Sequence, residues 1–131
     1  MIVLSNTAAQ TIQPGESVVF NRVVQRSGCD TLWSCGTGPL HIKCGIYALE
    51  FTGNVGGAPA TQPNLAITVD GVTLPETTMT VTTALDTDTF NVHASTRRRN
   101  CFAGSVVGVK NVGTTPVTLQ ANPALVVERR S

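Results

Sequence analysis

The residues that could do chemistry in this chain are two histidines, four cysteines and a few clustered charges. His41 and His93 are the only histidines, and either could act as a base near neutral pH. Cys44 or Cys101 together with His93 could form the catalytic pair of a cysteine hydrolase. Sequence spacing does not exclude this pair, because such residues meet only in the folded chain. The sequence contains no G-x-S-x-G, H-E-x-x-H or phosphate-binding glycine motif. We therefore predict that the protein is not an enzyme and that both histidines are ordinary strand or loop residues.

The four cysteines allow three pairings. The attractive pairing joins Cys29 to Cys35 across a short Gly-rich loop, while Cys44 and Cys101 meet between strands. A zinc site that includes His41 is an alternative, but the spacings C-x5-C and C-x8-C differ from those of compact zinc sites. Buried or loop thiols without a role are the third interpretation. No cofactor is predicted.

Two groups of charged residues could bind ions. Asp86 and Asp88 flank a threonine in a predicted turn, where they could bind calcium or simply form the turn. Arg97, Arg98 and Arg99 form the densest charge cluster and could bind an anion, an acidic glycan or the carboxylates of a partner. In a strand, Arg97 and Arg99 would point one way and Arg98 the other, whereas in a loop all three would be solvated.

The only tryptophan lies in a long segment, residues 27–39, that we predict to be a loop. Trp33 and its neighbour Leu32 are the apolar members of this loop. Trp33 could stack on a sugar ring, or it could anchor the loop on the body of the domain. An aromatic content of 5% makes a lectin that binds by aromatic stacking less persuasive.

Composition indicates which kind of fold positions these residues. Val, Thr and Ile together make up 41 of 131 residues, which favours strands over helices. A hydrophobic content of 41% excludes a disordered chain, and a net charge of +1 argues against a binder of nucleic acid or membrane surfaces. No apolar run is long enough for a transmembrane helix, and no export signal is visible. We therefore expect synthesis in the cytosol.

Apolar segments cut by turn signals predict eight to ten short strands in one domain over residues 14–131, after an N-terminal arm over residues 1–13. The segment Gly45 to Val55 shows the alternation best. The residues on its predicted core face are Tyr47, Leu49, Phe51 and Val55. The opposite face, which is small and mixed and suits either solvent or a subunit contact, carries Ile46, Ala48, Glu50 and Thr52. The other expected strands cover residues 17–26, 40–44, 64–70, 72–83, 89–97, 104–112 and 117–129.

Three segments carry a resemblance to a known family: GIYALEF at 45–51, LAITVDG at 65–71 and GSVVGVKN at 104–111. In this order they resemble the trimeric jelly rolls of the tumour necrosis factor (TNF) and complement-q superfamily, over roughly residues 12–129. Within this superfamily the three segments most resemble bacterial and phage proteins, including the heads of spore-surface collagen-like proteins and small virion proteins. The resemblance implies an antiparallel jelly-roll sandwich of about ten strands, a homotrimer, and a ring of nine arginines around the threefold axis from Arg97, Arg98 and Arg99.

The first functional hypothesis is a trimeric structural or adhesion module on a phage virion, as a capsid decoration or head-fibre protein. Its expected partners are its own copies and the major capsid protein or another virion component, and neither nucleic acid nor membrane. The alternative is a ligand-binding head on a bacterial or spore surface that recognises a glycan or a host protein. The expected location is accordingly the virion surface or, for the alternative, the surface of a cell or spore.

Overall fold

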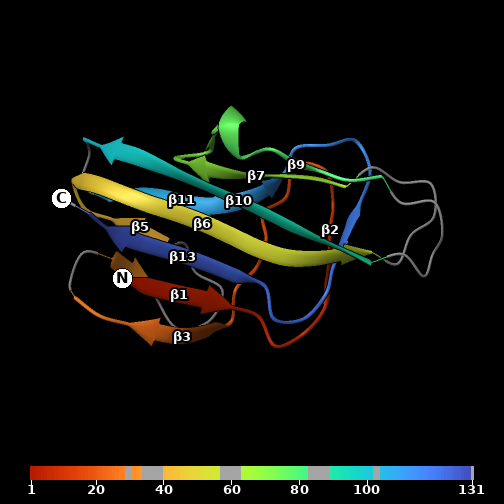
Figure 1. Ribbon diagram of the computed structural model, residues 1–131, viewed down its shortest axis with the longest axis horizontal. Helices are drawn as coiled ribbons and strands as arrows, with labels where there is room; N and C mark the ends of the chain where they lie inside the picture. Colours follow the sequence, from red (N-terminus) through yellow and green to blue (C-terminus); the bar gives the residue numbers. More distant parts are fainter. Residues whose placement is uncertain (29–30, 34–39, 57–62, 83–88, 102–103, 131) are drawn as a thin grey trace.

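The chain folds as an all-β sandwich of two antiparallel sheets, as its composition predicts. The computed structural model describes residues 1–28, 31–33, 40–56, 63–82, 89–101 and 104–130. Strands of the larger sheet run along the long axis of the molecule, and both termini lie at the same end (Figure 1). Among the described residues, no helix is both long and apolar enough to span a bilayer.

The larger sheet has seven strands within the described ranges. Six follow one another in space, in the order β2 (Gln10–Ile12), β12 (Val117–Leu119), β6 (Gly45–Gly56), β13 (Ala124–Arg129), β1 (Ile2–Ser5) and β3 (Arg22–Arg26). The seventh, β10 (Thr89–Asn100), pairs with β6 over twelve residues. These long-range pairings bring the chain termini and the middle of the sequence into one sheet.

The smaller sheet has six strands among the described residues. Its spatial order is β4 (Thr31–Trp33), β5 (Leu40–Ile42), β11 (Ser105–Asn111), β7 (Asn64–Val69) and β8 (Val72–Thr73), with β9 (Met79–Thr80) also paired to β7. A short 3-10 helix, η1 (Pro75–Thr77), interrupts the chain between β8 and β9. This interruption falls at Pro75, where the sequence predicts it.

The core lies between the two sheets, and β6 confirms the predicted alternation. Tyr47, Leu49 and Phe51 are at most 1% exposed. Gly53, in phase with them, must remain small, because a Cβ atom there would lie 2.9 Å from a methyl carbon of Leu119. The inward face of β6 is therefore filled to the limit of close packing.

The N-terminal residues, predicted as an arm over residues 1–13, instead contribute β1 and β2 to the larger sheet. Val3 of β1 pairs with Val126 of β13, and Ile12 of β2 pairs with Val117 of β12. Ile2, Leu4 and Ile12 are at most 2% exposed and belong to the core. A run of four apolar residues is too short for its periodicity to distinguish a strand of the sheet from an arm.

Two other predictions need correction. The predicted loop over residues 27–39 contains β4, which pairs with β5 through Leu32 and His41. The predicted strand over residues 17–26 is regular only from Arg22 to Arg26, and earlier residues instead lie against β11 through the bridge between Ser17 and Lys110. In both places the pairing partner is distant in sequence, so local pattern could not decide it.

An Asp-Gly pair between two apolar segments predicts a tight hairpin, and the structure has one at Asp70 and Gly71. Both residues have positive φ, 53° and 78°, which suits a two-residue hairpin turn of type I′. The turn joins β7 to β8, and the side chain of Asp70 accepts a hydrogen bond from the backbone of Val106 at 2.9 Å. A local sequence signal therefore determined this hairpin.

A buried hydroxyl completes the hydrogen bonding of β7 beside this hairpin. Thr77 of η1 is fully buried, and its Oγ1 accepts a hydrogen bond from the backbone N–H of Ile67 at 2.9 Å. The same hydroxyl donates to the carbonyl of Leu74 at 2.7 Å. The side chain thus stands in for the strand that β7 lacks at this point.

Replacing Thr77 with the isosteric valine should lower the free energy of unfolding by about 1–3 kcal/mol, because the buried N–H of Ile67 loses its acceptor. Urea denaturation of the wild type and the variant checks this. Thr78→Val is the matched control, since Thr78 is exposed and should change stability by only about 0.5 kcal/mol. Equal effects at the two positions would contradict the assignment.

Candidate functional site

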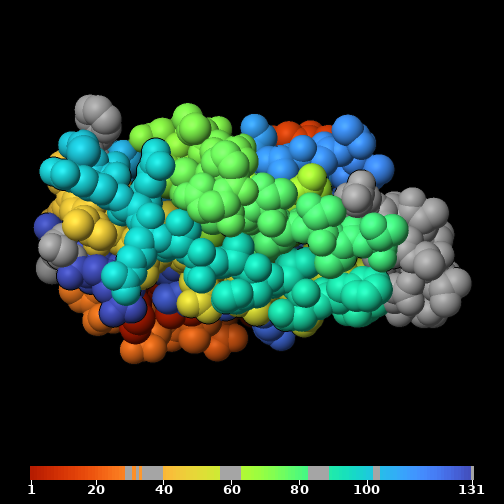
Figure 2. Space-filling model, turned by 45° about the horizontal axis from the view of Figure 1, so that its top comes forward, coloured from red at the N-terminus to blue at the C-terminus, as the bar shows by residue number. Residues whose placement is uncertain are grey.

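The outward side of the larger sheet carries Ile46, Ala48 and Glu50 of β6, which the sequence identifies as candidate site residues. It also carries most of the candidate site residues of β10. β6, β10 and β13 present alternate side chains on this side, away from the core. These residues define what we call the outer face: Ile46, Ala48, Glu50, Thr52, His93, Ser95, Arg97, Arg99, Ala124, Val126, Glu128 and Arg130. β10 forms a continuous strip of surface, between β6 and the residues around η1 (Figure 2).

The strand register arranges the outer face in rows. Glu50 lies between Ser95 of β10 and Val126 of β13, and Val126 in turn pairs with Val3. In the next row, Ala48 lies between Arg97 and Glu128, two residues that sequence alone could not bring together. The face therefore places the aliphatic side chains of Ala48 and Val126 directly beside charged side chains of both signs.

A carboxylate and a histidine pair on this face. Nε2 of His93 lies 3.2 Å from Oε1 of Glu50, and both side chains are 49% exposed. An ion pair exposed to this extent contributes at most about 1 kcal/mol to stability. Sequence analysis named both residues but did not predict that they meet, because they are 43 residues apart.

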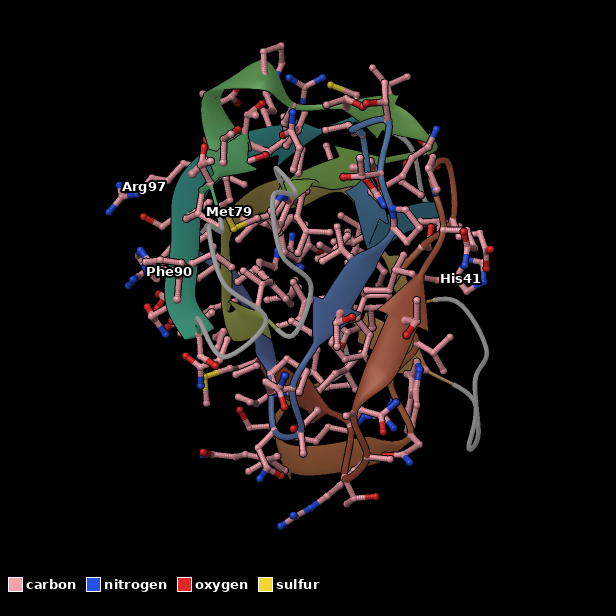
Figure 3. The ribbon with its side chains drawn as sticks, turned by 90° about the vertical axis from the view of Figure 1, so that its right-hand side faces the viewer. His41, Met79, Phe90 and Arg97 are labelled. Atoms are coloured by element: carbon pink, nitrogen blue, oxygen red, sulfur yellow. The ribbon has the colours of Figure 1, made fainter. Side chains whose placement is uncertain are left out.

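The arginine cluster lies in a strand, since β10 continues through Asn100. Alternation places Arg97 and Arg99 on the outer face and Arg98 on the other side, opposite Tyr47. Arg97 points away from the molecule in Figure 3, on the side opposite His41. The interpretation of these residues as a solvated loop is therefore wrong.

Arg130 and Glu128 are members of the outer face that sequence analysis missed. Nη2 of Arg130 lies 3.7 Å from Oε2 of Glu128. Arg130 and Arg97 both line a hollow of about 270 Å³ beside Ala48. Strand alternation could have predicted both residues. If Leu125 and Val127 point into the core, then Glu128 and Arg130 point outward.

The geometry does not assemble a cysteine hydrolase. His93 pairs with Thr52 in the middle of the β6–β10 ladder, whereas Cys44 and Cys101 lie beyond its end. Eight residues of strand separate His93 from Cys101, or roughly 26 Å. The other histidine, His41, bonds through Nδ1 to the carbonyl oxygen of Gly104 at 3.0 Å.

Cys44 and Cys101 are free and exposed, and they are neighbours. Sγ of Cys44 lies 3.3 Å from the carbonyl oxygen of Cys101. Cys29 and Cys35 lie outside the described residues, as do the calcium candidates Asp86 and Asp88. Within the described part of the chain, no three His, Cys, Asp or Glu residues cluster closely enough to hold a metal ion.

Trp33 packs against the core from β4 and is partly buried. It lines a hollow of about 250 Å³ together with Phe20, Leu40 and Val106. Leu32 precedes it in β4, but its side chain lies outside the described residues. Trp33 thus packs on the core from the smaller sheet, and it also borders an apolar recess.

Comparison with known proteins identifies the fold. No protein-family model matches the chain, and no curated protein matches it. Among solved structures, murine APRIL aligns with a TM-score of 0.70 and 13% identity over 97% of this chain and 98% of its own. Eiger TNF from S. frugiperda aligns with a TM-score of 0.77 and 9% identity, over 99% and 91% of the two chains. PRD1 vertex protein P5 aligns with a TM-score of 0.54 and 9% identity, over 99% and 94%.

These alignments cover nearly the whole chain and confirm the predicted TNF-like jelly roll. Identities this low establish the fold alone.

Proposed function

We propose that this protein is a non-enzymatic homotrimeric module on the outside of a phage particle, as a capsid decoration or head-fibre protein. The observation that carries the proposal is the group of half-buried aliphatic residues on the outer side of the larger sheet, next to charged residues of both signs. The fold supports it too, since the TNF-like resemblance implies a threefold trimer. PRD1 P5, a protein named for a particle vertex, has a similar fold.

The outer face suits a contact between copies. Ala48, Ala124 and Val126 belong to this face, Val3 of β1 lies beside Val126, and all four are half-buried. A sheet face that stays in water normally carries polar residues at these positions. Ile46, 39% exposed, extends the apolar strip toward the end of the sheet. Burial of this strip against other copies, related by rotational symmetry, would remove it from water.

Charge on the same face suits self-association as well. Arg97 can meet Glu50 or Glu128 of an adjacent copy, because the outer face holds both signs. Strand alternation reduces the predicted ring of nine arginines to six around the axis, since Arg98 points the other way. These six would bind partner carboxylates or an anion.

Light scattering tests the trimer directly. The purified chain should have a mass near three times 13.7 kDa, with and without reductant. Val126→Arg should yield a folded monomer, because a side chain of this size would hold the contacting copies apart, whereas on the monomer it can pair with the neighbouring Glu50 in solvent. Val72→Arg is the control, since Val72 is 63% exposed on the smaller sheet and should leave the trimer intact. A monomeric wild type, or a trimer insensitive to Val126→Arg, would overturn the proposal.

A ligand-binding head is the second candidate, favoured by the apolar recess beside Trp33. Trp33 is the only tryptophan, so binding of a glycan there would change the intrinsic fluorescence of the isolated domain. A particle component should instead co-purify with phage particles and leave this fluorescence unchanged when free sugars are added. The two measurements therefore separate the candidates.

A further inference from the structure

The two described cysteines meet where β6 begins and β10 ends. Gly45 pairs with Asn100 in the last row of the ladder, so Cys44 and Cys101 are the next residues outward on the two strands. Sγ of Cys44 is already in contact with the backbone of Cys101, 3.3 Å from its carbonyl oxygen. Both residues are exposed, so reagents in solution can reach them.

The backbone here suits a disulfide. The paired row next to the cysteines, Gly45 with Asn100, has the close backbone spacing of opposed antiparallel residues, about 4.5–5.5 Å between Cα atoms, and disulfides span about 4.4–6.8 Å. The side-chain amide of Asn100 donates to the carbonyl of Lys43 at 3.0 Å and holds the two strand ends together. Closure to a disulfide then requires the Cys44 side chain to turn from the carbonyl oxygen of Cys101 toward its sulfur.

We propose that Cys44 and Cys101 form a redox pair that closes to an intrachain disulfide by exchange with low-molecular-weight disulfides, anionic ones preferentially. The thiolate of one cysteine attacks the reagent disulfide, forming a mixed disulfide and releasing one reagent thiolate. The second cysteine then attacks the protein sulfur of the mixed disulfide and releases the other. The two protein thiols are oxidised, the reagent is reduced to two thiols, and the two protons pass to the released thiolates.

The surroundings of the pair explain the preference for anions. A hollow of about 630 Å³ is lined by both cysteines together with Arg99, Arg129 and Asn100, and no carboxylate lines it among the described residues. The guanidinium of Arg99 beside the thiols attracts an anionic reagent such as glutathione disulfide and repels a cationic one such as cystamine. Salt should weaken this discrimination.

The first experiment uses the chain with Cys29→Ser and Cys35→Ser, so that only Cys44 and Cys101 remain. Native protein treated with glutathione disulfide should lose both free thiols, keep the mass of one chain less two hydrogen atoms, and melt about 5–10 °C higher, because the bond links residues 57 apart. Stable glutathione adducts on both cysteines, or links between chains, would overturn the proposal. Peptide mapping of the oxidised wild type covers the case in which the serine variant fails to fold.

Matched variants then test each part. Adding Cys101→Ser should leave Cys44 as a stable glutathione adduct with no rise in melting temperature. In the two-cysteine chain at low salt, glutathione disulfide should react several-fold faster than cystamine, and Arg99→Gln should narrow that ratio. Arg22→Gln, on β3, is the control and should leave the ratio unchanged. Equal rates for the two reagents in the two-cysteine chain would exclude the anionic preference.

Discussion

Replacing Phe51 with alanine should lower the free energy of unfolding by about 3–5 kcal/mol. Phe51 is fully buried at the centre of β6, where the register places it between Ala94 of β10 and Leu125 of β13. Its ring also lies against Gly53, 3.3 Å from the position where a Cβ atom would stand. The strands on both sides are fixed by backbone pairing, so they cannot close the cavity that the missing ring would leave.

Urea denaturation at a fixed protein concentration measures this loss, because unfolding coupled to assembly depends on concentration. Val72→Ala provides the control, since Val72 is 63% exposed and should change stability by only about 0.5 kcal/mol. A typical domain has about 5–15 kcal/mol of stability in all, so the expected loss is a large fraction of it. A loss for Phe51→Ala below about 1 kcal/mol would contradict the central position of this ring.

Asn111→Asp should be comparably severe, at about 3–5 kcal/mol at neutral pH. Asn111 is 1% exposed, and its Nδ2 donates to the carbonyls of Ile12 and Thr115, each at 2.9 Å. An aspartate has no hydrogen to offer these two oxygens and places a buried negative charge against them. Its remaining contact, the hydrogen bond that Oδ1 accepts from the N–H of Gly113, would survive.

Asn54→Asp is the control for this change. Asn54 is exposed, and its Oδ1 accepts a hydrogen bond from Nδ2 of Asn91, a role that a carboxylate can keep. Comparison of urea midpoints and slopes for both variants checks the prediction. Similar stabilities of the two variants would show that Asn111 does not tie β2 and the turn after β11 together as described.

Local patterns were sufficient where one segment carries its own signal. The alternation of Tyr47, Leu49 and Phe51 predicts the buried side of β6, because successive side chains of a strand point to opposite faces. The Asp70–Gly71 pair predicts its hairpin, because only a few residue types readily adopt positive φ at both positions. The resemblance to the TNF superfamily then predicted correctly that these elements form a jelly roll.

Local patterns failed where the partner is distant. Strand β1 pairs with β13, more than a hundred residues away in the sequence. The residues around Ile2 do not indicate which segment is the pairing partner. Similarly, the local sequence leaves open whether the three arginines lie in a strand or in a loop, and the pairing of β6 with β10 through Asn100 places them in the strand. In each case tertiary pairing outweighed local sequence preference.

The sequence by itself determined the fold class, the core face of β6 and the turn at Asp70, because these follow from a two-residue period and from turn chemistry. Only the tertiary structure decided that β10 continues through the arginines, and that Glu50 meets His93 and Arg97 meets Arg130 around Ala48. The physical reason is strand register. A shift of one residue in the pairing of β6 and β10 would send one strand's side chains to the opposite face, and that register is set by burial summed over the whole sandwich.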